Sequence, residues 1–131
     1  MGKWTKAELN RLRRLMTDQG RGTLEIADEI RHQCSCSKLA AYRMAHGWSQ
    51  PEAAERYQQA TGGVMDQPLL SKLEQFPLAA SRAPLAAQLI GFATVYGTTP
   101  LRLVGPYTLE RLDPHERDVL VRCNTAFTPT P

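Results

Sequence analysis

The chain has 131 residues, of which 42% are hydrophobic and 22% are charged, and its formal net charge is +3. These proportions are typical of one globular domain with terminal extensions, and no apolar run is long enough to cross a bilayer. The sequence begins without the apolar stretch of a secretory signal, and its three cysteines cannot all pair within one chain, so we expect a cytoplasmic protein.

Positive charge is concentrated near the N-terminus. Residues 1–22 contain six Lys or Arg against two acidic residues, which leaves +4, whereas residues 37–76 are neutral overall. A basic arm beside a neutral body is suited to lie along phosphates, and Lys6, Arg13 and Arg14 are the candidates for those contacts. A solvated helix face is the alternative explanation of this pattern.

Three helices are predicted in the first part of the chain. Residues 5–18 and the stretch that begins at Thr23 carry apolar residues at a spacing of three or four. A third helix follows Ser37, whose hydroxyl is suited to cap it, and ends at Gly47, because glycine readily adopts the left-handed conformation found after helices.

The fourth predicted helix follows Ser49. Ser49 and Glu52 have the spacing of a capping box, and Pro51 fits the first turn because amides there have no partner inside the helix. The stretch QATGGV, residues 59–64, is expected to end this helix.

The fifth predicted helix is DQPLLSKLEQF, residues 66–76, with Asp66 as its N-cap. One side of it is apolar, and the other side is polar with hydrogen-bonding groups at helical spacing. The apolar stripe consists of Leu69, Leu70, Leu73 and Phe76. The polar side carries Gln67, Ser71 and Gln75, with Lys72 beside them.

Three more helices are predicted in the last third of the chain. A long one spans residues 84–97, a short one covers TTPLRLVG with Thr99 as its cap, and another covers LDPHERDVLVRC. In the last of these, Asp113 and Glu116 have capping-box spacing. The final stretch NTAFTPTP is rich in proline and polar residues, so we expect it to be disordered.

Two capped helices joined by a glycine-containing turn, the second with a polar outer face, are typical of a helix-turn-helix. Glutamine pairs with the N6 and N7 edge of adenine, and lysine donates to O6 and N7 of guanine. Gln50 begins the first helix of the pair, where free amides and the helix dipole favour a phosphate. The residues predicted to read bases are Gln67, Ser71, Lys72 and Gln75.

The segments LAAYRMAHGWSQPEAAERY, LLSKLEQF and LAAQLIGFATVYGTTPLRL, in this order, resemble the Xre or lambda-repressor-like family of helix-turn-helix regulators. The resemblance covers residues 37 to about 104 and implies a five-helix DNA-binding bundle, commonly dimeric on palindromic operators. The connection QQATGGVMDQ is longer than the tight turn of the family, so either the second helix is displaced or the first runs on. By position, the resemblance implies Gln50 as a phosphate clamp, Gln67, Ser71 and Lys72 as base contacts, and Glu74 as a structural acid.

Two alternatives remain open. The stretch LNRLRRLMTDQGRGTLEIADEIRHQCSCSKLAAYRMAHG, residues 9–47, resembles the three-helix module of recombinases and other homeodomain-like proteins. DNA would then be bound by the helix pair within residues 23–46, with Ser37, Lys38, Ala41 and Arg43 as the reading face. In the second alternative the same bundle binds a polypeptide, as an antitoxin-like partner or a regulator of another transcription factor. The neutral charge of the central residues favours this second alternative.

His32, Cys34 and Cys36 form a cluster of metal-binding residue types. A structural zinc site needs four ligands, normally in paired spacings, and the nearest further candidates, His46 and Cys123, are single residues. We therefore expect no metal and no cofactor. No cysteine has the supporting acid or oxyanion feature of a nucleophile, so we do not expect an enzyme.

The sequence as a whole predicts an all-α fold. Residues 1–36 are expected to form a helical extension of two helices, residues 37–105 a five-helix repressor-like DNA-binding domain, and residues 106–131 one short helix and a tail. The predicted function is sequence-specific binding of double-stranded DNA in transcriptional control, in the cytoplasm at the nucleoid and as a homodimer. The residues that either cover the core or form the two-fold interface are Leu101, Leu103, Val104, Leu112, Val119 and Leu120.

Overall fold

The computed structural model describes residues 4–76 and 83–124, and every regular element within these ranges is helical. The all-α prediction is therefore confirmed for this part of the chain. None of these helices is both long and apolar enough to cross a membrane. In chain order they are α1 (Lys6–Asp18), α2 (Thr23–Cys34), α3 (Lys38–Ala45), α4 (Gln50–Thr61), α5 (Gln67–Gln75), α6 (Ala86–Tyr96), the 3₁₀ helix η1 (Pro100–Leu103), α7 (Pro106–Arg111) and α8 (Pro114–Arg122).

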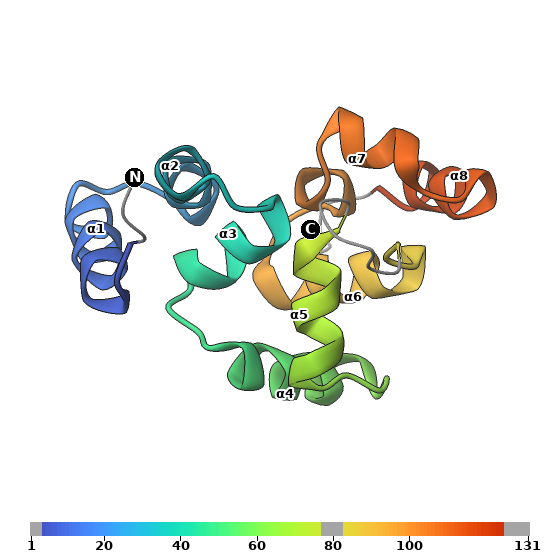
Figure 1. Cartoon of the computed structure of the whole chain (residues 1–131), viewed down its shortest axis with the longest axis horizontal. Helices are drawn as coiled ribbons and strands as arrows, with labels where there is room; N and C mark the ends of the chain where they lie inside the picture. The colour runs from blue at the N-terminus through green and yellow to red at the C-terminus, as the bar shows by residue number, and fades with distance from the viewer. Residues whose placement is uncertain (1–3, 77–82, 125–131) are drawn as a thin grey trace, which may run out of the picture.

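The helices are spread along one long axis, with α1 and α2 at one end and α8 at the other (Figure 1). Between them, α5 stands across the middle of the molecule and α4 runs beneath it. Helix α2 packs against α3, α4 packs against both α5 and α6, and α6 packs against α8. The two helices that carry most of the predicted site therefore contact each other in the centre of the fold.

Side-chain caps fix where α3, α4 and α5 begin. Ser37, Ser49 and Asp66 each accept a hydrogen bond from the amide three residues later, at 3.2, 3.2 and 2.9 Å. Each bond satisfies an amide that has no partner inside its helix, which is typically worth about 1 kcal/mol. These starts were predicted from the sequence, and the structure confirms them.

The first helix of the pair runs on, which is one of the two explanations that the sequence left open for the long connection between α4 and α5. Helix α4 continues through residues 59–61, which we expected to break it, and its C-cap is Gly62 with a left-handed φ of 73°. The Gln58 side chain then donates a hydrogen bond to the carbonyl oxygen of Met65, whose own side chain is fully buried. Residues 62–66 thus form a compact turn anchored to α4.

Helices α4 and α6 approach closely at a glycine. A Cβ atom added at Gly91 would stand 2.5 Å from Cε2 of Tyr57, so the ring of Tyr57 lies directly on the α6 backbone. The same ring packs against Phe92 with centroids 4.6 Å apart. This contact holds α4 against the core and with it the start of the predicted helix-turn-helix.

The apolar stripe of α5 faces the core as predicted. Leu70 and Leu73 are buried, while Leu69 and Phe76 are partly buried and pack against the same cluster. Because these residues recur every three or four positions, burying them directs the opposite side of α5 outward.

The C-terminal part of the described chain departs from the prediction of a single helix after residue 105. Two short helices, α7 and α8, lie there, and the residues before them form a 3₁₀ helix that has no side-chain cap from Thr99. Helix α6 begins at Ala86 rather than at Pro84, because Leu85 is still extended with ψ 151°. The tail predicted to be disordered lies, beyond Asn124, outside the described residues.

Glu116 does not complete the capping box predicted for α8. Asp113 does cap that helix, through the amide of His115, but Oε2 of Glu116 accepts a hydrogen bond from the amide of Ala86 at 3.0 Å. The carboxylate of one helix therefore caps the start of another, where the helix dipole favours a negative charge. The bond joins α8 to α6.

Apolar residues near the C-terminus cover the core of the monomer. Leu103, Val104, Leu112 and Leu120 are each at most 6% exposed. The remaining two residues considered for a two-fold interface, Leu101 and Val119, are partly buried against the same core. The homodimer remains a prediction, and these side chains offer little free surface for it.

Candidate nucleic-acid interface

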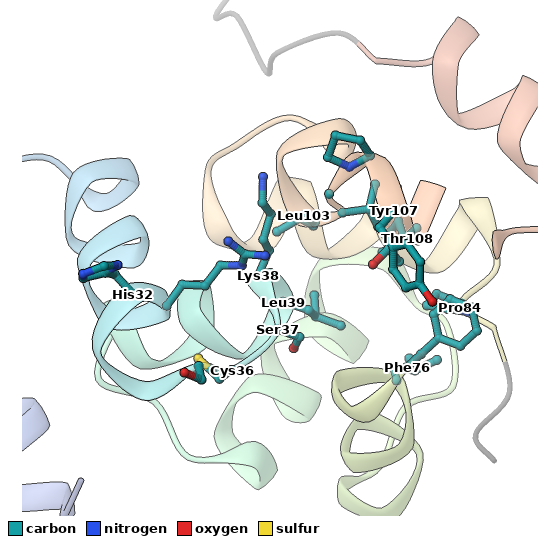
Figure 2. Close-up of a pocket in the computed structure, with 17 residues that line it drawn as sticks. His32, Cys36, Ser37, Lys38, Leu39, Phe76, Pro84, Leu103, Tyr107 and Thr108 are labelled. Atoms are coloured by element: carbon teal, nitrogen blue, oxygen red, sulfur yellow. The ribbon is translucent and has the colours of Figure 1, made fainter. Parts of the chain in front are cut away.

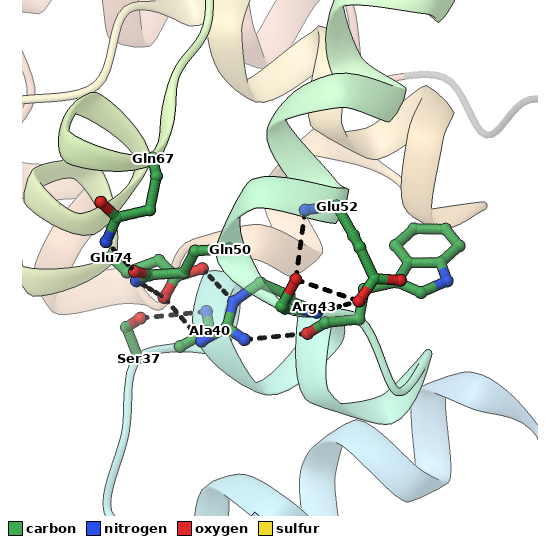
Figure 3. Close-up of polar contacts among 9 residues, drawn as sticks. Ser37, Ala40, Arg43, Gln50, Glu52, Gln67 and Glu74 are labelled. Atoms are coloured by element: carbon green, nitrogen blue, oxygen red, sulfur yellow. Dashed lines mark hydrogen bonds and ion pairs between the residues drawn. The ribbon is translucent and has the colours of Figure 1, made fainter.

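A chain of hydrogen bonds connects the starts of α4 and α5 (Figure 3). Nε2 of Gln67 donates to Oε1 of Gln50 at 2.8 Å, and Nε2 of Gln50 donates to Oε1 of Glu74 at 3.0 Å. Arg43, near the end of α3, donates from Nε and Nη2 to the two oxygens of Glu74, at 2.7 and 3.0 Å. One carboxylate thus joins three helices, and we call these four residues the polar cluster.

Arg43 and Glu74 form the buried base of the polar cluster. Their side chains are 13% and 6% exposed, and Nη1 of Arg43 also donates to the carbonyl oxygen of Trp48 at 3.0 Å. Burial alone would lower the pKa of Arg43, but the hydrogen bond and charge of Glu74 outweigh it and raise that pKa. The guanidinium and the carboxyl group are therefore paired directly in the interior, and the burial of Glu74 fits the structural role that the resemblance implied.

The side chains predicted to read bases lie on the outer face of α5. Gln67, Lys72 and Gln75 are exposed, and Ser71 is half-buried. Ser71 and Gln75 line a shallow hollow of about 290 Å³ together with Gln50. Gln50, Gln67, Ser71 and Gln75 are thus brought together at one surface, whereas Lys72 is exposed on α5 but does not line this hollow.

The basic residues of α1 have different surroundings. Lys6 and Gln50 line one hollow of about 400 Å³, so α1 places an ammonium group near the start of α4. Arg14 is exposed. Arg13 is half-buried: a Cβ at Gly47 would stand 3.0 Å from its Cζ, and its Nε is buried with no hydrogen-bond partner in the described part of the chain. Arg13 therefore packs against the connection between α3 and α4.

An aromatic group lies behind the start of α4, and its stacking contacts were not predicted from the sequence. The ring of Trp48 stacks on His46 with centroids 4.4 Å apart, and the guanidinium of Arg56 lies 4.2 Å from the Trp48 centroid. Nε2 of His46 donates to the carbonyl oxygen of Tyr96 at 2.9 Å, and burial lowers the pKa of His46. This group fixes the α3–α4 connection against α6. No local pattern indicates it, because Tyr96 lies 50 residues from His46.

The cysteines do not converge on a metal-binding arrangement in the described ranges. No group of three or more His, Cys, Asp or Glu side chains there has the geometry to hold a metal ion. Cys34 and Cys36 are half-buried free thiols, and Cys123 is an exposed one.

Comparison of the chain with protein-family models, with curated proteins and with solved structures finds no match.

Proposed function

We propose that the protein binds double-stranded DNA and regulates transcription, with α4 and α5 as the helix-turn-helix and α5 in the major groove. In this proposal α3 to η1 correspond to the repressor-like bundle, and α1 and α2 precede it. Gln67, Ser71, Lys72 and Gln75 read base edges, while Gln50 and Lys6 contact phosphates.

The observation that carries the proposal is the hydrogen bond between Gln67 and Gln50. A glutamine amide has one acceptor oxygen and two N–H donors, and Gln67 uses a single donor on Gln50. It keeps an oxygen and an N–H, the pair needed to accept from adenine N6 and donate to N7. Because the bond fixes the amide before DNA arrives, less side-chain entropy is lost on binding.

Gln50 is held in a similar way for a phosphate. Its oxygen accepts from Gln67 and one of its N–H groups donates to Glu74, which leaves its second N–H free to donate. It stands at the first position of α4, where backbone amides and the helix dipole favour an anion. The charge of Glu74 is neutralised by Arg43, so the buried carboxylate does not oppose the approach of a phosphate.

The alternative in which α3 reads DNA is disfavoured by burial. Ala41 is 1% exposed, and Arg43 is occupied by Glu74. Two of the four residues of that reading face are therefore committed to the interior of the protein. The polypeptide-binding alternative is favoured by the neutral charge of residues 37–76 and is separated from DNA binding by the experiment below.

The test is selection of bound fragments from a random duplex library at low salt, followed by titration of the selected site. Gln67→Ala should relax the preference at one base pair by about 1–3 kcal/mol, whereas Arg14→Ala should weaken binding to all sequences alike. Gln33→Ala, which removes an exposed glutamine on α2, is the matched control and should leave binding unchanged. Absence of any salt-sensitive DNA binding would refute the proposal and favour a polypeptide partner.

A further inference from the structure

A cavity of about 520 Å³ lies beside the C-terminal end of α5 (Figure 2). Cys36 and Ser37 line both this cavity and the shallow hollow that contains Gln50 and Glu74. Residues from α2 and α3, the C-terminal end of α5, η1 and the start of α7 line it. In Figure 2, Ser37 and Lys38 lie across the space from Phe76, Pro84, Tyr107 and Thr108. The volume is within the range of about 300–1,000 Å³ that is usual for small-molecule sites.

The floor of the cavity is apolar. Leu39, Leu73, Leu89 and Leu103 line it, and Leu39, Leu89 and Leu103 are at most 3% exposed. These leucines are already shielded from water, so the gain on binding would come mainly from the hydrocarbon body of the ligand, whose own apolar surface would leave water against this floor. The interior of the cavity therefore selects for an apolar group.

The rim of the cavity is positively charged. Arg31 and Lys38 line it, and none of the 17 lining residues is Asp or Glu. Neither cation forms a salt bridge with any residue in the ranges 4–76 and 83–124. The thiol of Cys36, which also lines the cavity, is uncharged at neutral pH because burial raises its pKa to about 11.

Lys38 occupies a position that the helix itself disfavours. It is the first residue of α3, where the helix dipole favours an acidic side chain and opposes a basic one. Its stem lies over the backbone before α7, with Cε 3.8 Å from where a Cβ at Gly105 would stand. The N-terminal end of α3 does not stabilise the positive charge of Lys38, whereas an anion in the cavity would.

We propose that this cavity binds a small carboxylate with an unbranched or aromatic apolar body, the carboxylate at Lys38 and Arg31 and the body against Leu39, Leu73 and Leu103. The site goes beyond the proposed DNA binding and does not depend on it. It faces the inner side of α5, whose outer side carries the predicted reading residues.

The first experiment is titration of the full chain with decanoate by calorimetry, beside decanol and decyltrimethylammonium. Decanoate should bind with one-to-one stoichiometry and a dissociation constant on the order of 1 mM or below, and the neutral and cationic analogues should bind about tenfold more weakly or not at all. Equal binding of decanol, or no binding of decanoate, would overturn the proposal without the need for a variant.

The second experiment places the site. Lys38→Met keeps the apolar stem and removes the charge, and it should weaken decanoate binding about tenfold, as loss of a charge-assisted hydrogen bond does. Lys72→Met removes an exposed lysine on the other side of α5 and serves as the matched control, with unchanged affinity expected. If both variants bind decanoate as the unmodified protein does, the carboxylate is not held at this rim and the proposal fails.

Discussion

The two sides of α5 differ in whether the charged side chains near them are paired. On one side Arg43 and Glu74 neutralise each other in the interior, and their remaining hydrogen-bonding capacity positions Gln50 and Gln67 at the surface. On the other side, Arg31 and Lys38 line the cavity, and neither cation has a salt-bridge partner in the described residues.

The difference between paired and unpaired charges indicates where the protein is suited to bind a ligand. A buried charge without its partner is expensive, so a protein places paired charges where the structure must be fixed. Arg31 and Lys38, which have no salt-bridge partner within residues 4–76 and 83–124, do not fix the fold in this way. The polar cluster is therefore interpreted as preorganisation of a surface, and the cavity as a site completed by an anion.

The strongest test of the comparison is Glu74→Ala. It leaves the guanidinium of Arg43 buried without a counter-charge, and we expect the free energy of unfolding to fall by about 3–5 kcal/mol. Urea denaturation followed by circular dichroism measures the loss. The double variant Arg43→Met/Glu74→Leu removes both charges and should recover most of the loss. If the double variant is as unstable as Glu74→Ala, the loss of stability does not come from leaving the charge of Arg43 without a counter-charge.

The contact between Gly91 and the ring of Tyr57 is purely apolar, and its disruption gives a loss of stability to compare with that of Glu74→Ala. Gly91→Ala should lower the free energy of unfolding by about 1–3 kcal/mol, because the new methyl group would overlap the ring of Tyr57. The sign is informative, since alanine alone favours a helix over glycine by about 1 kcal/mol. Ala87→Gly, at an exposed position of the same helix, measures that propensity in place. Stabilisation by Gly91→Ala would show that α4 and α6 are not in close contact there.

Gln50→Ala tests how firmly the polar cluster holds the surface. It removes two hydrogen bonds from a half-buried site, and we expect a loss of about 1 kcal/mol in the same denaturation experiment. Gln59→Ala, on the exposed side of the same helix, should change stability by less than about 0.5 kcal/mol. If the two losses are equal, the bonds from Gln50 to Gln67 and Glu74 do not persist in solution.

The sequence predicted those features that depend on neighbouring residues. The caps at Ser37, Ser49 and Asp66 act over three residues, and the alternation of faces along α5 follows from helical spacing, so both could be read from local pattern. The run-on of α4 was one of two explanations of the long connection, and the sequence could not decide between them because residues 59–61 are polar or small and show no apolar stripe. Helix α7 has six residues, too few to establish a period.

The candidate site was predicted as a set of residues and not as an arrangement. That Gln50 and Gln67 would bond across the turn, or that Glu74 would reach Arg43, depends on how three helices pack, and residues 31 positions apart carry no local signal of contact. Arg13 shows the same limit. The packing of its guanidinium against Gly47 has no local signal in the sequence, and its contact with a phosphate stays a prediction.

The variant with the smallest expected effect, Lys38→Glu, should change the free energy of unfolding in the opposite direction to a variant of the polar cluster. Lys38→Glu places an acid at the first position of α3, where the helix dipole favours it, and at the rim of the cavity that Arg31 also lines. The free energy of unfolding should rise by about 0.3–1 kcal/mol at low ionic strength, and added salt should reduce the gain. The same variant should lose decanoate binding, because the rim no longer attracts an anion.

Removing a charge from the polar cluster lowers stability, whereas reversing the charge of Lys38 is expected to increase stability and abolish decanoate binding. A less stable Lys38→Glu protein would show that Lys38 supports the fold itself, and the contrast between the two sides would not hold.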